Sequence, residues 1–143
     1  MFGWLVKRLK LQQNLRVDVG ADLVRIADIG TALETFGERY LKRVFTEREV
    51  RYCIRSGNDA ALGSLAARFA AKEAVMKILR PDANTDLPWT SIEVIRAESG
   101  APDISLSGNA TRLAKSAGIA RFALSLSHDG DYATATALAM RFA

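Results

Sequence analysis

The stretch that decides the fold is Leu65-Ala66-Ala67-Arg68-Phe69-Ala70-Ala71-Lys72-Glu73-Ala74-Val75-Met76-Lys77. It is dense in Ala, Leu, Lys and Glu and contains neither Gly nor Pro, which favours an α-helix. Its large apolar side chains recur near the helical period and predict one buried stripe, formed by Leu65, Phe69, Met76 and Leu79. The stretch therefore predicts a long helix, running to about Leu79, that carries charge next to its apolar side.

Three cations accompany one carboxylate in this helix, since Arg68, Lys72 and Lys77 lie close to Glu73 in the sequence. Such a group can hold a metal-bound polyphosphate, so phosphate chemistry is the leading hypothesis. The alternative is a solvated helix face, because Glu73 precedes Lys77 by four residues and such surface pairs are worth about 0.2–0.5 kcal/mol each. The rest of the chain has to decide between the two.

Length and composition are those of an ordinary globular domain. The 143 residues can bury a core of their own, and 49% apolar with 25% charged residues is usual for a globular protein. Cys53 is the only cysteine, which excludes an internal disulfide and favours a reducing compartment. We expect a cytoplasmic protein with one domain over residues 16–143, preceded by a basic extension over residues 1–15.

The net charge of +4 belongs to the N-terminal segment. Residues 1–16 contain four basic side chains and no acidic one, and the rest of the chain is neutral. Nucleic-acid binding normally needs basic residues clustered over a folded face, so no nucleic-acid partner is expected. The leader has its apolar residues before its basic ones, unlike a signal peptide, and no apolar run approaches about 18 residues. Neither secretion nor stable membrane insertion is predicted.

The order of elements predicts an α+β fold with an antiparallel sheet packed on the long helix. Residues 17–23 alternate like a half-buried strand, and helical spacing follows as far as Tyr40. Thr46 and Glu49 form a capping box that begins another helix. Further strands are predicted over residues 91–96, 103–106, 122–127 and 132–140, with a short helix over 108–117. The last strand has an all-alanine face that would let the helix or another subunit approach closely.

Two further side chains could join Glu73. Asp22 closes the first strand and is either a helix N-cap or a ligand for a hard cation, with Gly20 allowing close approach. His128, the only histidine, ends a strand and is either a surface residue or a donor to phosphate. A His-ligated metal is not favoured, because neither a second His nor a Cys stands near His128. Two carboxylates instead suit Mg²⁺. Because no Walker loop is present, bound phosphates would depend on side chains and metal.

Four segments, taken together and in this order, resemble the holo-acyl carrier protein synthases, which are the single-repeat members of the 4′-phosphopantetheinyl transferase superfamily. These segments are Gly20–Val24, Arg43–Glu49, Arg68–Ala74 and Ser125–Asp129 with the following Tyr132-Ala133. The resemblance covers about residues 16 to 141. It implies the single-repeat fold of that family and a homotrimer with sites between subunits.

The resemblance also implies an activity, in fatty acid or polyketide biosynthesis. The phosphopantetheine arm of the co-substrate coenzyme A would pass to a serine of an apo acyl carrier protein, releasing adenosine 3′,5′-bisphosphate. Asp22 and Glu73 would bind Mg²⁺, and Lys77 would contact the pyrophosphate. The proton of the serine would go to Glu73, to a metal-bound water or to a neutral Lys72. The alternative is a non-catalytic homologue that binds the carrier protein and has lost coenzyme A turnover.

The nucleotide end of coenzyme A would be held by the strand of Ser127 and His128, with Arg68 assisting. The carrier protein would dock on basic side chains, namely Arg39, Lys42, Arg43, Arg48, Arg51 and Arg55. Acidic residues are interleaved with these, so a mixed solvated face is the alternative. The sequence departs from the family at Arg25 and Asp28 and in the segments 80–84 and 100–102, which predicts altered carrier docking and altered nucleotide contacts.

Overall fold

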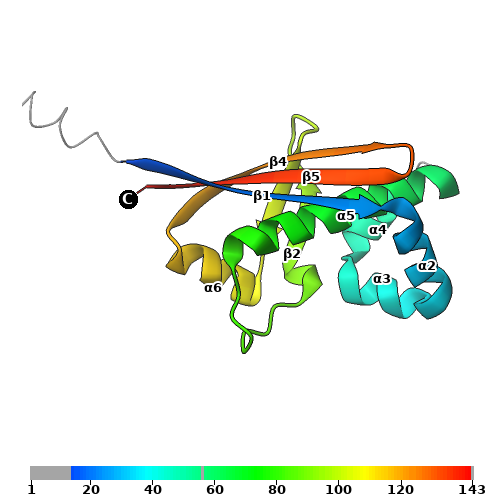
Figure 1. Cartoon of the computed structure of the whole chain (residues 1–143), viewed down its shortest axis with the longest axis horizontal. Coiled ribbons are helices and arrows are strands. Elements are labelled where there is room, and N and C mark those ends of the chain that lie inside the picture. Colours follow the sequence, from blue (N-terminus) through cyan, green and yellow to red (C-terminus); the bar gives the residue numbers. More distant parts are fainter. Residues whose placement is uncertain (1–13, 56, 143) are drawn as a thin grey trace, which may run out of the picture.

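The computed structural model describes residues 14–55 and 57–142, so the predicted extension lies almost wholly outside the described residues (Figure 1). The first half of the chain contains β1 (Leu15–Arg25), α2 (Ile26–Phe36), α3 (Glu38–Val44), α4 (Glu47–Ile54) and α5 (Asn58–Leu79). The second half contains the 3₁₀ turn η1 (Trp89–Ser91), β2 (Ile92–Arg96), β3 (Pro102–Leu106), α6 (Gly108–Ser116), β4 (Ile119–Asp129) and β5 (Tyr132–Phe142).

The strands form two antiparallel sheets. The larger has the order β1-β5-β4, and β2 and β3 form a separate hairpin. Helix α5 runs along one face of the larger sheet, and α2, α3 and α4 lie on the same side, near the end where β1 leads into α2 (Figure 1). The α+β class and the antiparallel pairing are confirmed. The described helices, in residues 14–55 and 57–142, include none that is long and apolar enough to cross a bilayer.

Helix α5 is enclosed on nearly all sides, so the predicted single stripe was too narrow. Leu65 and Leu79 are buried, but so are the alanines of the stretch, Ala66, Ala67, Ala70, Ala71 and Ala74. The alanine face of β5 is also buried, and it packs against α5 in the two core clusters. Small side chains on both elements let the helix lie close to the sheet, which large side chains would prevent.

The two faces of β1 are the reverse of the usual expectation for an alternating strand. Val17, Val19 and Leu23 are exposed, whereas Gly20 is buried and Asp22 is half-buried beneath α5. A Cβ atom on Gly20 would collide with the carbonyl oxygen of Ala74, so this position has no room for a side chain. Alternation predicts two different faces but not which one is covered, and here the close approach of α5 decides.

Two helix boundaries follow local chemistry. The helical spacing that reaches Tyr40 is divided between α2 and α3 at Gly37, which has a φ of 56° in the left-handed region that favours glycine. The predicted capping box is present at α4, where Thr46 and Glu49 each accept a hydrogen bond from the other's backbone N–H. Glu49 is thereby fixed in place at the first turn of the helix.

Candidate functional site

Asp22 lies opposite the C-terminal part of α5 and contacts Lys77. The Lys77 Nζ atom donates to Asp22 Oδ1 over 3.0 Å and to the Ala21 carbonyl oxygen over 2.7 Å. Asp22 is not a helix cap, because the N-cap of α2 is Arg25. The N-cap interpretation is therefore wrong, and the polar side of β1 delivers Asp22 to the helix that carries Glu73.

Glu73 shares this neighbourhood. Its carboxyl is half-buried, and burial raises its pKa above the ordinary value. The carboxylate of Asp22 raises the pKa further, while the ammonium of Lys77 acts in the opposite direction. Two carboxylates that influence each other across a strand–helix contact are a natural site for a cation, because a cation relieves their mutual repulsion.

The two carboxylates suit a Mg²⁺ site that is completed by water and substrate phosphates. They do not suit a metal site in which all ligands come from the protein. The described residues, 14–55 and 57–142, contain no group of three or more His, Cys, Asp or Glu side chains that could hold a metal. Asp22 and Glu73 supply two carboxylates, and Mg²⁺ is usually held by one or two carboxylates together with water and substrate phosphates. Lys77 already places one positive charge at this position.

A pocket of about 340 Å³ lies beside the N-terminal half of α5. Besides Lys77, the residues predicted to bind the coenzyme are Arg68, Ser127 and His128. All three line this pocket. The remaining lining residues are Tyr52, Ala60, Ser64, Ala67, Ile95, Arg96, Pro102 and Leu126. The wall thus mixes apolar side chains with cationic ones, as a pocket for an anionic organic ligand requires.

Arg68 and His128 are held in the pocket by specific contacts. Arg68 donates from Nη1 to the Ser64 hydroxyl over 2.8 Å, and its guanidinium carbon lies 4.4 Å from the centre of the Tyr52 ring. His128 packs on Gly63, where a Cβ atom would lie 2.9 Å from its Nδ1. Glycine at this position of α5 therefore makes room for the imidazole.

The pocket and the carboxylate pair are close neighbours on the sheet. His128 pairs with Ala133 of β5, and Asp22 pairs with Ala135 of the same strand, two residues further on. Helix α5 carries Arg68 at the pocket and Glu73 at the carboxylate pair. One helix and one central strand therefore join the two groups into a single elongated site.

Tyr52 and Arg96 line this pocket although the sequence alone did not single them out. Arg96 ends β2, and its guanidinium carbon lies 4.7 Å from the centre of the Tyr52 ring. Neither residue belongs to a segment with a recognisable motif. Their partnership depends on α4 lying next to β2, which no local sequence signal predicts.

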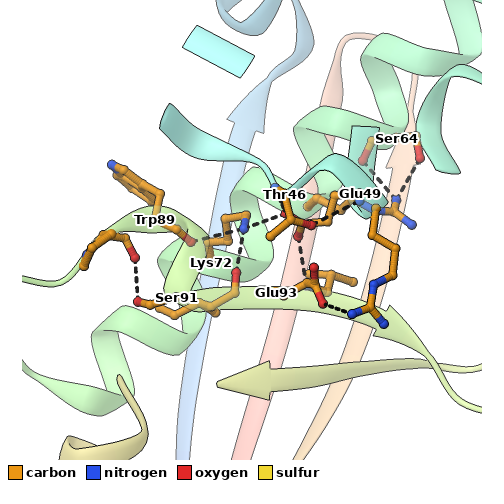
Figure 2. Close-up of polar contacts among 12 residues, drawn as sticks. Thr46, Glu49, Ser64, Lys72, Trp89, Ser91 and Glu93 are labelled. Carbon is orange, nitrogen blue, oxygen red and sulfur yellow. Dashed lines mark hydrogen bonds and ion pairs between the residues drawn. The ribbon is translucent and has the colours of Figure 1, made fainter. Parts of the chain in front are cut away.

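Lys72 lies elsewhere, and its contacts argue against the predicted catalytic role. Figure 2 shows its ammonium among polar groups in the interior, where its side chain is 0% exposed. It donates to Glu49 Oε2 over 2.9 Å and to the carbonyl oxygens of Trp89 and Ile92. The other carboxylate oxygen of Glu49 accepts from the Val94 N–H over 2.8 Å. All donors of Lys72 are thus engaged in joining α4, α5, η1 and β2.

The predicted basic docking surface is divided. Lys42 pairs with Glu38 over 3.5 Å, and Arg48 pairs with Glu93 over 3.2 Å. A hollow of about 520 Å³ contains two of the remaining arginines, and it is lined by Phe36, Arg39, Tyr40, Arg43, Val44, Phe69 and Trp89. The rings of its two aromatic residues from α5 and η1 are stacked, with centres 5.0 Å apart. This hollow combines apolar and basic groups on one surface.

Comparisons with known proteins agree with this geometry. Residues 18–137 match the family model of the 4′-phosphopantetheinyl transferase superfamily. The holo-[acyl-carrier-protein] synthase of Chlamydia trachomatis serovar L2 is 44% identical over 121 residues, which are 85% of this chain and 97% of that protein.

Two solved structures show the same fold with a ligand. The ACPS–CoA complex of Chronobacterium ammoniagenes has a TM-score of 0.74 and 33% identity, covering 90% of this chain and 98% of its own. The Helicobacter pylori holo-[acyl-carrier-protein] synthase in complex with coenzyme A has a TM-score of 0.72 and 28% identity, with coverages of 85% and 99%. The chain therefore belongs to the 4′-phosphopantetheinyl transferase superfamily, among the holo-acyl carrier protein synthases.

Proposed function

We propose that the protein transfers the 4′-phosphopantetheine arm of coenzyme A to a serine of an apo acyl carrier protein. The observation that carries the proposal is the joined site on α5. Asp22, Glu73 and Lys77 form its charged end, and a cationic, partly apolar pocket with Arg68 and His128 continues from it. The C. trachomatis relative and the two coenzyme A complexes support this assignment.

Each group of the site suits one part of coenzyme A. We assign the pyrophosphate to Lys77 and to Mg²⁺ held by Asp22 and Glu73, and the nucleotide end to the pocket of Arg68, Ser127 and His128. When bound, Mg²⁺ would supply positive charge that neutralises the phosphate oxygens. This division places fixed positive charge along the whole anionic half of the co-substrate.

The reaction displaces one oxygen at phosphorus by another. The serine oxygen of the carrier attacks the phosphorus that bears the pantetheine arm, the bond from this phosphorus to the bridging oxygen breaks, and adenosine 3′,5′-bisphosphate leaves with the bonding electrons. Lys77, whose ammonium lies 3.0 Å from Asp22, would stabilise the charge that grows on the leaving group. Of the two side chains considered as proton acceptors, Glu73 faces the site and Lys72 does not. We therefore assign the proton of the serine to Glu73 or to a water beside it, and not to Lys72.

The carrier protein would dock at the hollow beside Phe36. This side chain is 60% exposed, and Arg39 and Arg43 take part in none of the ion pairs found within residues 14–55 and 57–142. Acyl carrier proteins are acidic, so free arginines around an exposed aromatic ring offer both attraction and apolar contact. We assign carrier recognition to this hollow and not to the whole basic set between residues 39 and 55.

The outer face of the larger sheet supports association between subunits, which we propose to be a homotrimer with sites between them. Its exposed apolar side chains are Leu15, Val17, Val19, Leu23, Tyr132, Leu138 and Phe142. A contiguous apolar face of this kind normally marks a protein–protein interface. Because β1 carries Asp22 on its other face, association through this sheet would place subunit boundaries next to the site.

The proposal is tested with a fluorescent coenzyme A whose label is attached to the pantetheine thiol. The wild-type protein should label an apo acyl carrier protein in the presence of Mg²⁺ and should not label the same carrier with its acceptor serine changed to alanine. The test is repeated with several carrier proteins of the host. If a carrier binds but none of them is labelled, the protein is instead a non-catalytic homologue.

A further inference from the structure

The basic extension that precedes β1 has no role in the proposed reaction. Its residues 2–11 combine large apolar side chains with cations and contain no acidic residue. The apolar side chains are Phe2, Trp4, Leu5, Val6, Leu9 and Leu11, and the cations are Lys7, Arg8 and Lys10. Cations beside tryptophan, phenylalanine and leucine are typical of segments that bind at the surface of a membrane without crossing it.

The extension joins the described structure at one end of the larger sheet. Strand β1 begins at Leu15, which pairs with Phe142, the last residue of β5. Strand β4 begins at Ile119, which pairs with Arg141. This end of the sheet lies on the side of α6, away from α2, α3 and α4 (Figure 1). A surface that binds the extension must lie close to this end, because Lys10 is only five residues before Leu15.

This end of the sheet is cationic. The residues that pair across its three strands include no acid: they are Leu15, Arg16, Val17, Ile119, Arg121, Met140, Arg141 and Phe142. Arg16, Arg121 and Lys115 of the last turn of α6 are exposed. None of these three takes part in an ion pair found within residues 14–55 and 57–142. Asp18, the first acid along β1, is already paired with Arg141 over 2.7 Å.

The opposite end of the sheet is acidic. The hairpin between β4 and β5 and the first turn of α2 expose Asp28, Asp129 and Asp131, against one neighbouring cation, Arg25. The N–H of Ile26 donates to the Asp131 carbonyl oxygen over 2.8 Å and holds the two segments together. An anionic surface would therefore attract one end of the sheet and repel the other, which would orient the molecule on it.

The orientation leaves the proposed site accessible. Asp22 is seven residues along β1 from Leu15, which corresponds to about 23 Å of strand. A molecule held by its cationic end thus keeps the carboxylate pair of Asp22 and Glu73 off the surface and open to a substrate.

We propose that the extension and the cationic end of the larger sheet bind reversibly to the surface of a bilayer that contains anionic lipids. The apolar side chains of the extension favour this partner over a nucleic acid, because the headgroup boundary can bury Phe2 and Trp4 while Lys7, Arg8 and Lys10 contact the lipid charges. The inference does not depend on the transfer reaction.

The test is co-sedimentation of the full chain with vesicles of phosphatidylcholine, alone or mixed with anionic phosphatidylglycerol. The wild-type protein should bind the anionic vesicles at least about a hundredfold more tightly than the neutral ones. The triple variant Lys7→Gln, Arg8→Gln, Lys10→Gln should lose about a hundredfold in affinity, because each cation near the surface contributes about fivefold. Lys115→Gln combined with Arg121→Gln should lose about tenfold, which tests the described end of the sheet.

A matched control removes the same charge from another surface. Arg48, Arg51 and Arg55 are exposed on α4, and Arg48→Gln, Arg51→Gln, Arg55→Gln should change the affinity for anionic vesicles less than about twofold. The contribution of apolar contact is read from Trp4. In a Trp89→Phe background Trp4 is the only tryptophan, and its fluorescence should shift to shorter wavelength with the anionic vesicles alone.

Equal affinity for the two kinds of vesicle, or an equal loss in the α4 control and in the triple variant of the extension, would overturn the inference. So would an absence of vesicle binding while duplex DNA or the apo carrier protein binds the wild type and not the triple variant, since the extension would then serve that partner. Transfer measured without vesicles should be the same in the wild type and in the triple variant, so a protein without transferase activity still gives a decisive vesicle result.

Discussion

Lys72 and Glu73 are consecutive residues, and α5 presents them to different surroundings. Successive side chains of an α-helix point about 100° apart, so one turns into the interior between α4 and β2 and the other toward Asp22. Burial lowers the pKa of the Lys72 ammonium, which Glu49 opposes, and raises the pKa of the Glu73 carboxyl. The chemistry of each charge follows from its neighbours and not from its place in the motif.

The first prediction concerns the titration of Glu73. Its carboxyl should titrate above the ordinary pKa of 4.5, and Asp22→Asn should lower its pKa because the repelling carboxylate is gone. Lys77→Met should raise the pKa, since the ammonium favours the charged form. Carboxyl ¹³C NMR of the metal-free protein measures all three values.

The raised pKa of Glu73 has a consequence for metal binding. A protonated carboxyl does not coordinate a cation, so affinity for Mg²⁺ should fall as the pH decreases through the raised pKa of Glu73, at a higher pH than for an exposed glutamate. A pKa that is unchanged in both Asp22→Asn and Lys77→Met would show that the three side chains do not share one site.

The second prediction concerns the buried pair of Lys72 and Glu49. Lys72→Met leaves a buried carboxylate unpaired and should lower the free energy of unfolding by about 3–5 kcal/mol. Glu49→Gln should also destabilise, and the double variant should lose less than the sum of the two, because neither charge is then left alone. Urea denaturation measures these losses.

Lys42 supplies the matched control, because its pair with Glu38 is on the surface, with side chains 80% and 85% exposed. Lys42→Met should cost no more than about 0.5 kcal/mol. A Lys72→Met protein of wild-type stability that has lost transfer would contradict the structural role and restore Lys72 as a catalytic candidate.

At the scale of elements, the contact of β1 with α5 depends on glycine, which gives the third prediction. Gly20→Ala should destabilise by about 1–3 kcal/mol, because the new methyl meets the backbone of Ala74 and neither element can move without the other. Gly63→Ala should instead leave stability nearly unchanged and weaken nucleotide binding, because the methyl meets the imidazole of His128, a side chain, and not backbone. Thermal unfolding and calorimetry with adenosine 3′,5′-bisphosphate separate the two effects.

Gly30 is the control for both substitutions. It lies inside α2, and a Cβ atom there would make an ordinary contact of 3.8 Å with Leu62. Gly30→Ala should stabilise the protein by about 0.5–1 kcal/mol through helix propensity alone. A loss of stability in Gly63→Ala as large as in Gly20→Ala would show that His128 is fixed and cannot yield.

Most elements could be predicted from local signals, and their assembly could not. The capping box at Thr46, the turn before Pro102 and the glycine after α6 each have a local cause that the sequence displays. The division at Gly37 was missed because a glycine inside a helical pattern is often tolerated. The separation of β2 and β3 from the larger sheet has no local sign in the sequence.

The candidate site shows the same limit at the scale of the whole molecule. Asp22, Glu73 and His128 could be nominated because each stands in a recognisable segment. Tyr52 and Arg96 could not, since they come together only where α4 meets β2. The buried pairing of Lys72 with Glu49 could not be predicted either, because a charge within a motif gives no sign of whether it faces a ligand or a buried partner.

The fourth prediction concerns assembly of the whole molecule. If the outer face of the larger sheet joins subunits, Val19→Lys should convert the trimer to a monomer, because Val19 is 66% exposed at the centre of that face and a charge cannot be buried there unpaired. Analytical ultracentrifugation measures the mass in solution. Ile54→Lys is the control, since Ile54 is 59% exposed on α4 and should leave the mass unchanged. A monomeric wild-type protein would contradict the trimer.

The central claim, that the site on α5 transfers phosphopantetheine, is tested most directly by the intact mass of an apo acyl carrier protein. The carrier is incubated with coenzyme A, Mg²⁺ and either the wild-type protein or Glu73→Gln. We predict that the wild type adds one phosphopantetheine group per carrier. Glu73→Gln should do so at a rate reduced at least about a hundredfold. A carrier mass that stays unchanged with the wild-type protein, or that increases equally fast with Glu73→Gln, would contradict the account.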